Sequence, residues 1–440
     1  MENSLIVRGG KKLQGNVTLS GAKNVSLKVI IASLLLDEEV TLTNVPHIQD
    51  VIELLHLIKS LGGKAEFFEK NKVVIDGRGI NKNKVDLLHA SKIRVSFMFF
   101  APLLHKFQEC YVPNPGGCRI GARPIDRIIE GMKKLGILVE YNHESGYYFA
   151  KLDQKPKGHY RFEKPTHTGT ELLTMLGMMG DEVIIDNAAQ EPEIDQLILF
   201  LNKCGAKIVK DGKRIKVHKS GKLQVPGPFE IPADRNEAVT FASLALATGG
   251  DIFIGPIDPA LLKSFIQKTK DIGASVDYLG KSMLRFSVTR PLKASSVETS
   301  PHPGFMTDWQ PNWAVLMTQA TGDSIIHERV FENRFSYVSE LRKLGAEIDF
   351  IKIPVHHPSE YFFFNFDPSK KYNQAIRIYG SQKLHGGVLN IADLRAGATL
   401  AIAALAAVGE SVITGASILD RGYDDFVGKI RILGGDITRI

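Results

Sequence analysis

The sequence predicts an α/β protein of two similar domains, each made of three repeats around buried helices. A helix-to-strand junction marked by glycine recurs six times, and a polar turn followed by an apolar helix recurs in the same rhythm. The length of 440 residues is a third argument, because one hydrophobic core rarely serves so long a chain.

The glycine junction reads Leu61-Gly62-Gly63-Lys64-Ala65-Glu66-Phe67 in its first copy and Leu344-Gly345-Ala346-Glu347-Ile348-Asp349-Phe350 in its fifth. We expect the first glycine of each copy to adopt a left-handed conformation, which ends the helix and lets a strand begin. These glycines are Gly62, Gly136, Gly205, Gly273, Gly345 and Gly434.

Each repeat also contains a polar turn that opens a helix with apolar residues on nearly every face. Such a helix must be buried on every face, so it predicts the centre of a domain. The six turns include Gly21, Arg94, Thr168, Asp234, Thr307 and Asp393.

Three repeats in each domain divide the chain evenly. The division should fall near 226–232, where three prolines and a glycine interrupt the pattern. We therefore assign residues 1–22 plus 233–440 to one domain and residues 23–232 to the other. The sixth repeat is longer by roughly one hairpin, and the excess lies around 351–379.

The composition is that of a soluble globular protein, with 44% hydrophobic and 23% charged residues. Three scattered cysteines predict a reducing compartment rather than a disulfide scaffold. The N-terminus has no signal-peptide pattern, and the apolar stretch 398–408 is too short to span a membrane. We expect a cytoplasmic protein that is a monomer or a weak homo-oligomer.

A formal charge of +7 is compatible with nucleic-acid binding, but the basic residues are dispersed and no nucleic-acid module is recognisable. We therefore expect neither nucleic-acid nor membrane partners. No cysteine or histidine motif supports a metal site, and His356-His357 is expected to be an exposed turn.

Basic residues stand at the starts of four predicted central helices, namely Lys23, Arg94, Arg235 and Arg395. Helix N-termini attract anions, so these residues predict a pocket for phosphate or carboxylate groups. The alternative, a local cap or ion pair, carries equal weight for any one of them.

The segment 114–126 carries the most specific pattern, with Pro115-Gly116-Gly117 before Cys118. Proline and paired glycines predict a loop, and Arg119 and Arg123 beside the cysteine should favour its thiolate. Cys110 and Cys204 lie in strand and helix patterns, where packing is the expected role.

The segment 114–126 resembles the catalytic loop of the UDP-N-acetylglucosamine 1-carboxyvinyltransferase family of enolpyruvyl transferases. Other signatures of that family follow in order along the chain. They are Gly21-Ala22-Lys23-Asn24, Asn187-Ala188-Ala189-Gln190-Glu191-Pro192-Glu193-Ile194, Pro301-His302-Pro303 with Thr307-Asp308, Phe331-Glu332-Asn333-Arg334-Phe335, Asp393-Leu394-Arg395-Ala396 and Asp420-Arg421-Gly422-Tyr423.

The resemblance implies an inside-out α/β barrel fold and transfer of enolpyruvyl from phosphoenolpyruvate to the 3-hydroxyl of UDP-N-acetylglucosamine. It implies that Lys23, Arg123 and Arg421 bind phosphoenolpyruvate. Cys118 would protonate phosphoenolpyruvate or trap it covalently, and Asp308 would be the general base. The other implied contacts are Asn24, Arg94 and Asp308 for the amino sugar, Pro124, Ile125, Asp126, Thr168, Gly169 and Val330 for the uridine diphosphate, and Arg334, Asp393 and Arg395 for closing the two domains.

An acid, a base and fixed cations suffice for such an addition and elimination, so no cofactor or metal is expected. Three positions, His167, Arg127 and Asn236, depart from the family pattern near the acceptor. Two other functions therefore stay open: transfer to a different acceptor, such as shikimate 3-phosphate, and a UDP-sugar-binding regulator with weak catalysis.

Overall fold

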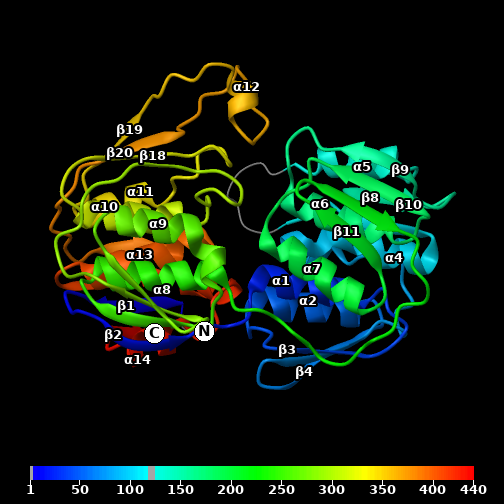
Figure 1. The fold of residues 1–440 in the computed structure, drawn as a ribbon, viewed down its shortest axis with the longest axis horizontal. Helices are drawn as coiled ribbons and strands as arrows, with labels where there is room; N and C mark the ends of the chain where they lie inside the picture. Colours follow the sequence, from blue (N-terminus) through cyan, green and yellow to red (C-terminus); the bar gives the residue numbers. More distant parts are fainter. Residues whose placement is uncertain (1–2, 117–123) are drawn as a thin grey trace. The chain divides into compact units, whose positions relative to one another are not determined.

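The computed structural model describes residues 3–116 and 124–440 (Figure 1). The described chain divides into two compact units, and each is described by itself. Unit 1 comprises residues 3–20 and 233–440, and unit 2 comprises residues 21–116 and 124–232. Within the described residues, no helix is both long enough and apolar enough to cross a membrane.

Unit 1 is built around three helices that contact one another and have almost no exposed surface. They are α8 (Arg235–Ala247), α10 (Gln310–Gln319) and α13 (Leu394–Ala406). The helical segments outside them are η2 (Pro259–Leu262), α9 (Lys263–Asp271), α11 (Val338–Lys343), α12 (Pro358–Tyr361), η3 (Ala416–Arg421) and α14 (Phe426–Ile432).

The described residues of unit 1 form three four-stranded sheets. The first, in the order β21-β22-β1-β23, contains β21 (Val388–Asn390), β22 (Glu410–Thr414), β1 (Ser4–Arg8) and β23 (Asp436–Arg439). The second, in the order β15-β16-β14-β2, contains β15 (Ser275–Leu279), β16 (Met283–Ser287), β14 (Asp251–Gly255) and β2 (Gln14–Thr18). The third, in the order β17-β18-β20-β19, contains β17 (Val297–Glu298), β18 (Ser324–His327), β20 (Ala375–Ile378) and β19 (Ile348–Ile351).

Unit 2 repeats this plan around α1 (Lys23–Ser33), η1 (Arg94–Phe99) with α4 (Phe100–Phe107), and α6 (His167–Gly177). The helices outside them are α2 (Gln49–Ser60), α3 (Leu87–Ala90), α5 (Asp126–Lys134) and α7 (Pro192–Lys203). The expected helix at Arg94 thus begins as a 3₁₀ segment. Pro102 in α4 has no backbone N–H, so it cannot donate the α-helical hydrogen bond to the carbonyl of Met98 at the junction of the two segments.

The described residues of unit 2 form two four-stranded sheets and one three-stranded sheet. The order β13-β3-β5-β4 contains β13 (Phe229–Glu230), β3 (Val40–Thr43), β5 (Lys72–Asp76) and β4 (Lys64–Glu69). The order β11-β12-β10-β9 contains β11 (Lys207–Asp211), β12 (Arg214–His218), β10 (Glu182–Asp186) and β9 (Gly158–Arg161). The order β6-β8-β7 contains β6 (Glu109–Pro113), β8 (Tyr147–Lys151) and β7 (Leu138–Asn142).

The sheets confirm the repeat predicted from the glycines. Each four-stranded sheet has one parallel pair at an edge followed by two antiparallel pairs, as in β2–β14–β16–β15. In the three-stranded sheet a single parallel bridge between Lys84 and Tyr111 stands where the fourth strand would be. All six junction glycines have a positive φ, between 85° and 100°. The α/β repeat prediction is therefore confirmed.

The excess in the sixth repeat lies where it was expected. It is the connection 352–374 between β19 and β20, a fully described segment that contains the one-turn helix α12 and no strand. Aromatic rings of its run 361–366 pack against one another.

Candidate functional site

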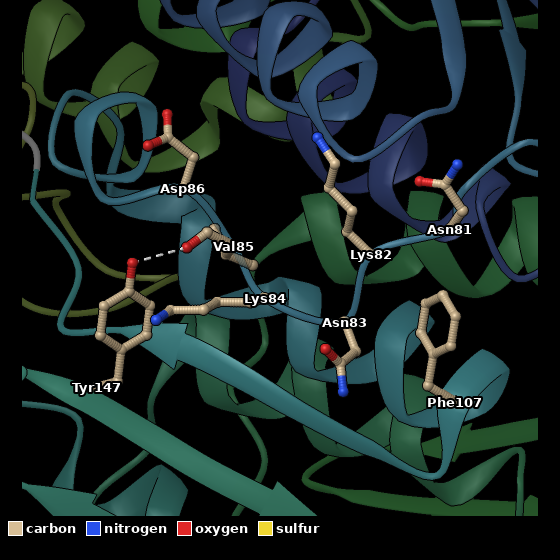
Figure 2. A pocket seen from close by; sticks show the side chains of 8 residues that line it. All are labelled: Asn81, Lys82, Asn83, Lys84, Val85, Asp86, Phe107 and Tyr147. Carbon is tan, nitrogen blue, oxygen red and sulfur yellow. Dashed lines mark hydrogen bonds between the residues drawn. The ribbon is translucent and has the colours of Figure 1, made fainter.

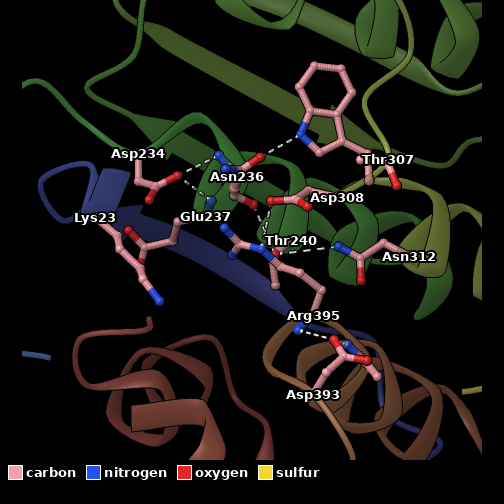
Figure 3. Close-up of polar contacts among 12 residues, drawn as sticks. Lys23, Asp234, Asn236, Glu237, Thr240, Thr307, Asp308, Asn312, Asp393 and Arg395 are labelled. Atoms are coloured by element: carbon pink, nitrogen blue, oxygen red, sulfur yellow. Dashed lines mark hydrogen bonds and ion pairs between the residues drawn. The ribbon is translucent and has the colours of Figure 1, made fainter. Parts of the chain in front are cut away.

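The carboxylate of Asp308 forms ion pairs with two arginines of unit 1, Arg334 and Arg395. Figure 3 shows Asp308 beside Arg395. Nη2 of Arg334 donates to Oδ1 of Asp308 at 2.7 Å, and Nε of Arg395 donates to Oδ2 at 3.3 Å. The side chain of Asp308 is 23% exposed, whereas those of Arg334 and Arg395 are 4% and 9% exposed. One face of the carboxylate is thus accessible while its partners are fixed by burial.

Two opposing effects act on the pKa of Asp308. Burial raises the pKa, but the positive charges of Arg334 and Arg395 outweigh it and hold the pKa well below its usual range. Asp308 is therefore an anion at every physiological pH. In this arrangement it accepts hydrogen bonds well but is a weak base.

Arg334 is held by a buried polar chain behind it. Its Nη1 donates to Oγ1 of Thr307 at 2.8 Å, and that hydroxyl donates to Oε2 of Glu328 at 2.8 Å. Oε1 of Glu328 accepts from the backbone N–H groups of Val330 and Phe331 at 2.7 and 3.0 Å. Burial raises the pKa of Glu328 despite the nearby charge of Arg334. The loop that carries Val330 is thereby tied to Arg334.

Arg395 is held by Tyr423 and the central helices of unit 1. Its Nη1 donates to the Tyr423 hydroxyl at 3.2 Å, and that hydroxyl lies 2.8 Å from Oγ1 of Thr240 on α8. Asn312 on α10 donates to the same Thr240 oxygen at 3.4 Å (Figure 3). The site thus rests on all three buried helices of unit 1.

The aspartates at two of the predicted polar turns of unit 1, Asp393 and Asp234, act as helix caps. Oδ1 of Asp393 accepts from the backbone N–H groups of Arg395 and Ala396, and Oδ2 accepts from Ser336. Asp234 caps α8 in the same way. The departure at Asn236 has a structural reason, since its amide oxygen accepts from Nε1 of Trp309 at 2.9 Å. Arg421 ends η3 and is half-buried.

In unit 2, Lys23 begins α1 and forms a buried ion pair in which Nζ lies 2.8 Å from Oδ2 of Asp50. A bound anion would therefore compete with Asp50 for this ammonium group. Asn24 follows on the same helix and is half-buried. Arg94 begins η1, and its guanidinium lies 5.8 Å from the centroid of the Phe97 ring.

Five of the six residues expected along a nucleotide lie within unit 2, where α5 packs on α6, whereas the sixth, Val330, belongs to unit 1. Pro124, Ile125 and Asp126 lead into α5, and Thr168 and Gly169 lie in the first turn of α6. Gly169 permits this approach, because a Cβ there would lie 3.0 Å from Cγ1 of Ile128 and 2.5 Å from Cγ2 of Thr166.

Cys118 and Arg123 lie outside the described residues. Cys110 and Cys204 are buried, as expected for packing residues. Burial raises the pKa of Cys204 to about 11 and raises that of Cys110 further. Neither is suited to act as a nucleophile.

The family model for EPSP synthase (3-phosphoshikimate 1-carboxyvinyltransferase) matches residues 7–430. The chain belongs to the EPSP synthase family. Among its relatives is a protein of Idiomarina loihiensis named UDP-N-acetylglucosamine 1-carboxyvinyltransferase, 37% identical over 437 residues and covering 99% of this chain and 98% of the relative. A protein of the same name from Desulforapulum autotrophicum is 36% identical and covers 99% of both chains.

Solved structures show the same fold. The enolpyruvyl transferase NikO from Streptomyces tendae superposes with a TM-score of 0.84 at 20% identity, covering 100% of this chain and 99% of that one. EPSP synthase from Acinetobacter baumannii gives a TM-score of 0.70 at 18% identity, covering 99% of both chains. The inside-out α/β barrel expected for this chain is the fold of the EPSP synthase family, as these likenesses confirm.

One charged cluster in this family member was missed from the sequence. Glu171 on α6 is fully buried, with Nζ of Lys28 at 3.3 Å and Nε2 of His167 at 3.2 Å from its carboxylate oxygens. Burial lowers the pKa of His167, but the charge of Glu171 outweighs it and the pKa is raised. The available signal was Lys28 and Glu171, two charges inside helices that are otherwise apolar.

A pocket of about 600 Å³ in unit 2 is separate from these residues (Figure 2). It is lined by residues 81–86, Phe107 and Tyr147, none of which is a predicted site residue. Its lysines have partners, because Lys82 donates to the carbonyl of Ser60 at 2.7 Å and Nζ of Lys84 lies 4.6 Å from the Tyr147 ring centroid.

Metal binding has no support in the arrangement of the described side chains. Among residues 3–116 and 124–440, no group of three or more His, Cys, Asp and Glu side chains is placed to hold a metal ion.

Proposed function

We propose that this chain transfers the enolpyruvyl group of phosphoenolpyruvate to the 3-hydroxyl of UDP-N-acetylglucosamine and releases phosphate, a step of peptidoglycan synthesis. The observation that carries the proposal is full-length similarity, at 36–37% identity, to relatives named for this reaction. The ionised Asp308 with its two arginines supports it, because the reaction needs a group that orients a sugar hydroxyl.

In the proposed reaction Cys118 donates a proton to the methylene carbon of phosphoenolpyruvate, and the sugar oxygen attacks the cationic carbon that forms. The resulting tetrahedral ketal loses phosphate and a proton to give the enol ether. Lys23, Arg123 and Arg421 would neutralise the phosphate and carboxylate of phosphoenolpyruvate.

The pairing of Asp308 refines its expected role. A carboxylate with two guanidinium partners first acts as an acceptor that orients the sugar hydroxyl. It becomes a stronger base only when one arginine contact is lost, because that loss raises its pKa. The hydrogen bond from Nε of Arg395 to Oδ2 of Asp308 is the longer one, at 3.3 Å against 2.7 Å for the bond from Nη2 of Arg334 to Oδ1. We therefore propose that the sugar hydroxyl replaces Arg395 as the partner of Oδ2.

Asn24 and Arg94 would contact the amino sugar, and Asp126, Thr168, Gly169 and Val330 would lie along the uridine diphosphate with Pro124 and Ile125. Asp126 and Thr168 belong to helices that contact each other in unit 2, which supports a shared ligand for them. Closure of the two domains through Arg334, Asp393 and Arg395 belongs to the same proposal, as does a cytoplasmic location.

The deciding experiment measures phosphate release from phosphoenolpyruvate with UDP-N-acetylglucosamine or shikimate 3-phosphate as acceptor. We expect release only with the sugar nucleotide. Release with shikimate 3-phosphate alone would replace the proposed acceptor. Tight binding of UDP-N-acetylglucosamine without phosphate release would instead identify a regulator.

A further inference from the structure

The connection 352–374 is far longer than the formation of its hairpin requires. It joins the antiparallel neighbours β19 and β20. The corresponding neighbours β4 and β5 of unit 2 are joined by residues 70–71, and β11 and β12 are joined by residues 212–213. The additional residues of this connection therefore serve something other than strand pairing.

The connection, which carries α12 (Figure 1), has a small aromatic core of its own. The rings of Phe362 and Phe364 stack with centroids 4.9 Å apart, and Phe364 lies 5.2 Å from Tyr372. Phe362 and Phe364 are 5% and 6% exposed. This packing gives the connection a defined shape, so it can hold a neighbouring segment in place.

That neighbouring segment is the loop 328–334, which follows β18. The guanidinium of Arg329 lies 4.0 Å from the Tyr361 ring centroid and 5.2 Å from that of Phe363. Arg329 also donates through Nη2 to the carbonyl of Tyr361 at 2.9 Å, and its own carbonyl accepts from the N–H of Phe363 at 2.8 Å. The first half of the loop is thus clamped by the connection.

Gln374, the last residue of the connection, binds the rest of the loop. Its Nε2 donates to the carbonyls of Glu328 and Phe331 at 2.8 and 3.0 Å, and its Oε1 accepts from the N–H of Asn333 at 2.7 Å. Gln374 is 7% exposed, so water cannot readily replace these bonds. One side chain therefore satisfies three backbone groups of a loop that has no strand partner there.

The loop carries the groups that contact the Asp308 site. The carboxylate of Glu328 accepts hydrogen bonds from the Thr307 hydroxyl and from two N–H groups of the loop. Arg334, at the end of the loop, donates a hydrogen bond to Asp308. Asn333, which Gln374 holds, has a left-handed φ of 53° directly before Arg334. A change in the loop at Asn333 would therefore redirect the Arg334 side chain.

We propose that Gln374 is a positioning residue for the reaction, which fixes the loop 328–334 and thereby sets Arg334 against Asp308 and Val330 toward the acceptor. This inference rests on the proposed function. It assigns a role to the connection 352–374, whose anchoring end is Gln374.

The test compares Gln374→Ala and Gln374→Glu with Lys371→Ala, a change at an exposed residue of the same connection. Gln374→Glu keeps an oxygen that can accept from the N–H of Asn333 but loses the two hydrogen bonds that the amide nitrogen donates. Because it keeps the side-chain volume, it serves as the test if the alanine variant fails to fold. For both Gln374 variants we expect kcat/KM for UDP-N-acetylglucosamine to fall by about tenfold to a hundredfold. The KM for phosphoenolpyruvate should stay within about twofold of its original value.

Hydrogen exchange of the amides of residues 329–334 provides a readout that needs no substrate. We expect faster exchange there in both Gln374 variants and an unchanged pattern in Lys371→Ala. Unchanged exchange at 329–334, or unchanged kcat/KM for the sugar nucleotide, would overturn the inference. If the unaltered protein shows no turnover with that acceptor, the proposed function fails, and the exchange data still decide whether Gln374 holds the loop.

Discussion

Arg334 holds Asp308 through one guanidinium nitrogen and Thr307 through the other, at 2.7 and 2.8 Å. The two contacted residues are neighbours in sequence, so one arginine fixes both the carboxylate and the backbone that carries it. Glu328 accepts a hydrogen bond from the Thr307 hydroxyl and so lies close to the positive charge of Arg334. Asp308 is therefore positioned before any substrate arrives, and its ionisation depends on its partners.

Replacement of Asp308 by asparagine should reduce stability in a pH-dependent way. The folded-state pKa of Asp308 is depressed, so its stabilising contribution is present above the unfolded value of about 3.9 and is lost as pH falls through the folded value. We expect the free energy of unfolding of Asp308→Asn to be about 2 kcal/mol lower at pH 7 than that of the unaltered protein. This difference should shrink below about pH 4.

Tryptophan fluorescence during urea denaturation measures this effect in unit 1 alone. The sequence has two tryptophans, and both Trp309 and Trp313 lie in unit 1 beside Asp308. A stability difference that stayed constant from pH 7 to pH 3 would show that the arginines do not shift the pKa of Asp308.

Tyr423→Phe removes the hydroxyl that links Arg395 to Thr240. We expect a loss of about 1–2 kcal/mol of stability, because two buried polar groups lose a partner. We also expect kcat/KM to fall by about tenfold, since Arg395 becomes less well oriented. Because Arg395→Lys disturbs the same contact, the double variant should lose less than the sum of the single losses. Strictly additive losses would mean that Tyr423 acts independently of Arg395.

His167→Gln should reduce thermal stability more at acidic than at alkaline pH. His167 faces Glu171, Lys28 and Glu191, and its pKa is raised in the folded state. The charged imidazolium therefore contributes its full stabilisation at pH values below the pKa of the unfolded state, about 6.5. That stabilisation is lost as pH rises through the folded value. Calorimetry near pH 5.5 and pH 9 gives the comparison, with His143→Gln as a control at an exposed histidine. An equal difference at both pH values would exclude a charged His167.

Iodoacetamide should modify Cys118 in the native protein and leave Cys110 and Cys204 intact. Both of the latter are buried, and burial raises the pKa of their thiols. In Cys118→Ser, mass spectrometry should then detect no label, and inhibition of the enzyme by the epoxide fosfomycin should disappear. Cys118→Asp removes the thiol but retains a group that can donate a proton. Native labelling at Cys110 or Cys204, or persistent inhibition of Cys118→Ser, would contradict this assignment.

The repeat and its helix starts could be predicted because their signals are local. Gly62 and Gly345 mark left-handed helix ends, and the aspartates that cap α8 and α13 precede apolar helices. The 3₁₀ start at Arg94 was missed, since an apolar pattern does not distinguish it from an α-helix.

The partners within the site could not be predicted from spacing. Asp308 is 26 residues from Arg334 and 87 from Arg395, and their pairing depends on how the loop 328–334 and α13 pack. Gln374 lies in the additional segment of the sixth repeat, and its partners belong to the loop 328–334, about 40 residues earlier in the chain. Lys28 and Glu171 were visible as charges, but their contact requires knowledge of the packing of α1 and α6.

The first strand of the chain completes a sheet with the last. β1 lies between β22 and β23, and Ser4 and Ile440 exchange backbone hydrogen bonds at 3.0 and 2.9 Å. During synthesis, all residues of unit 2 have been made once the ribosome passes residue 232, so unit 2 can fold while unit 1 is still incomplete. Residues 4–8 must wait for residues 410–439, which are synthesised after the whole of unit 2. Assembly of this sheet is therefore delayed until well after unit 2 has left the ribosome.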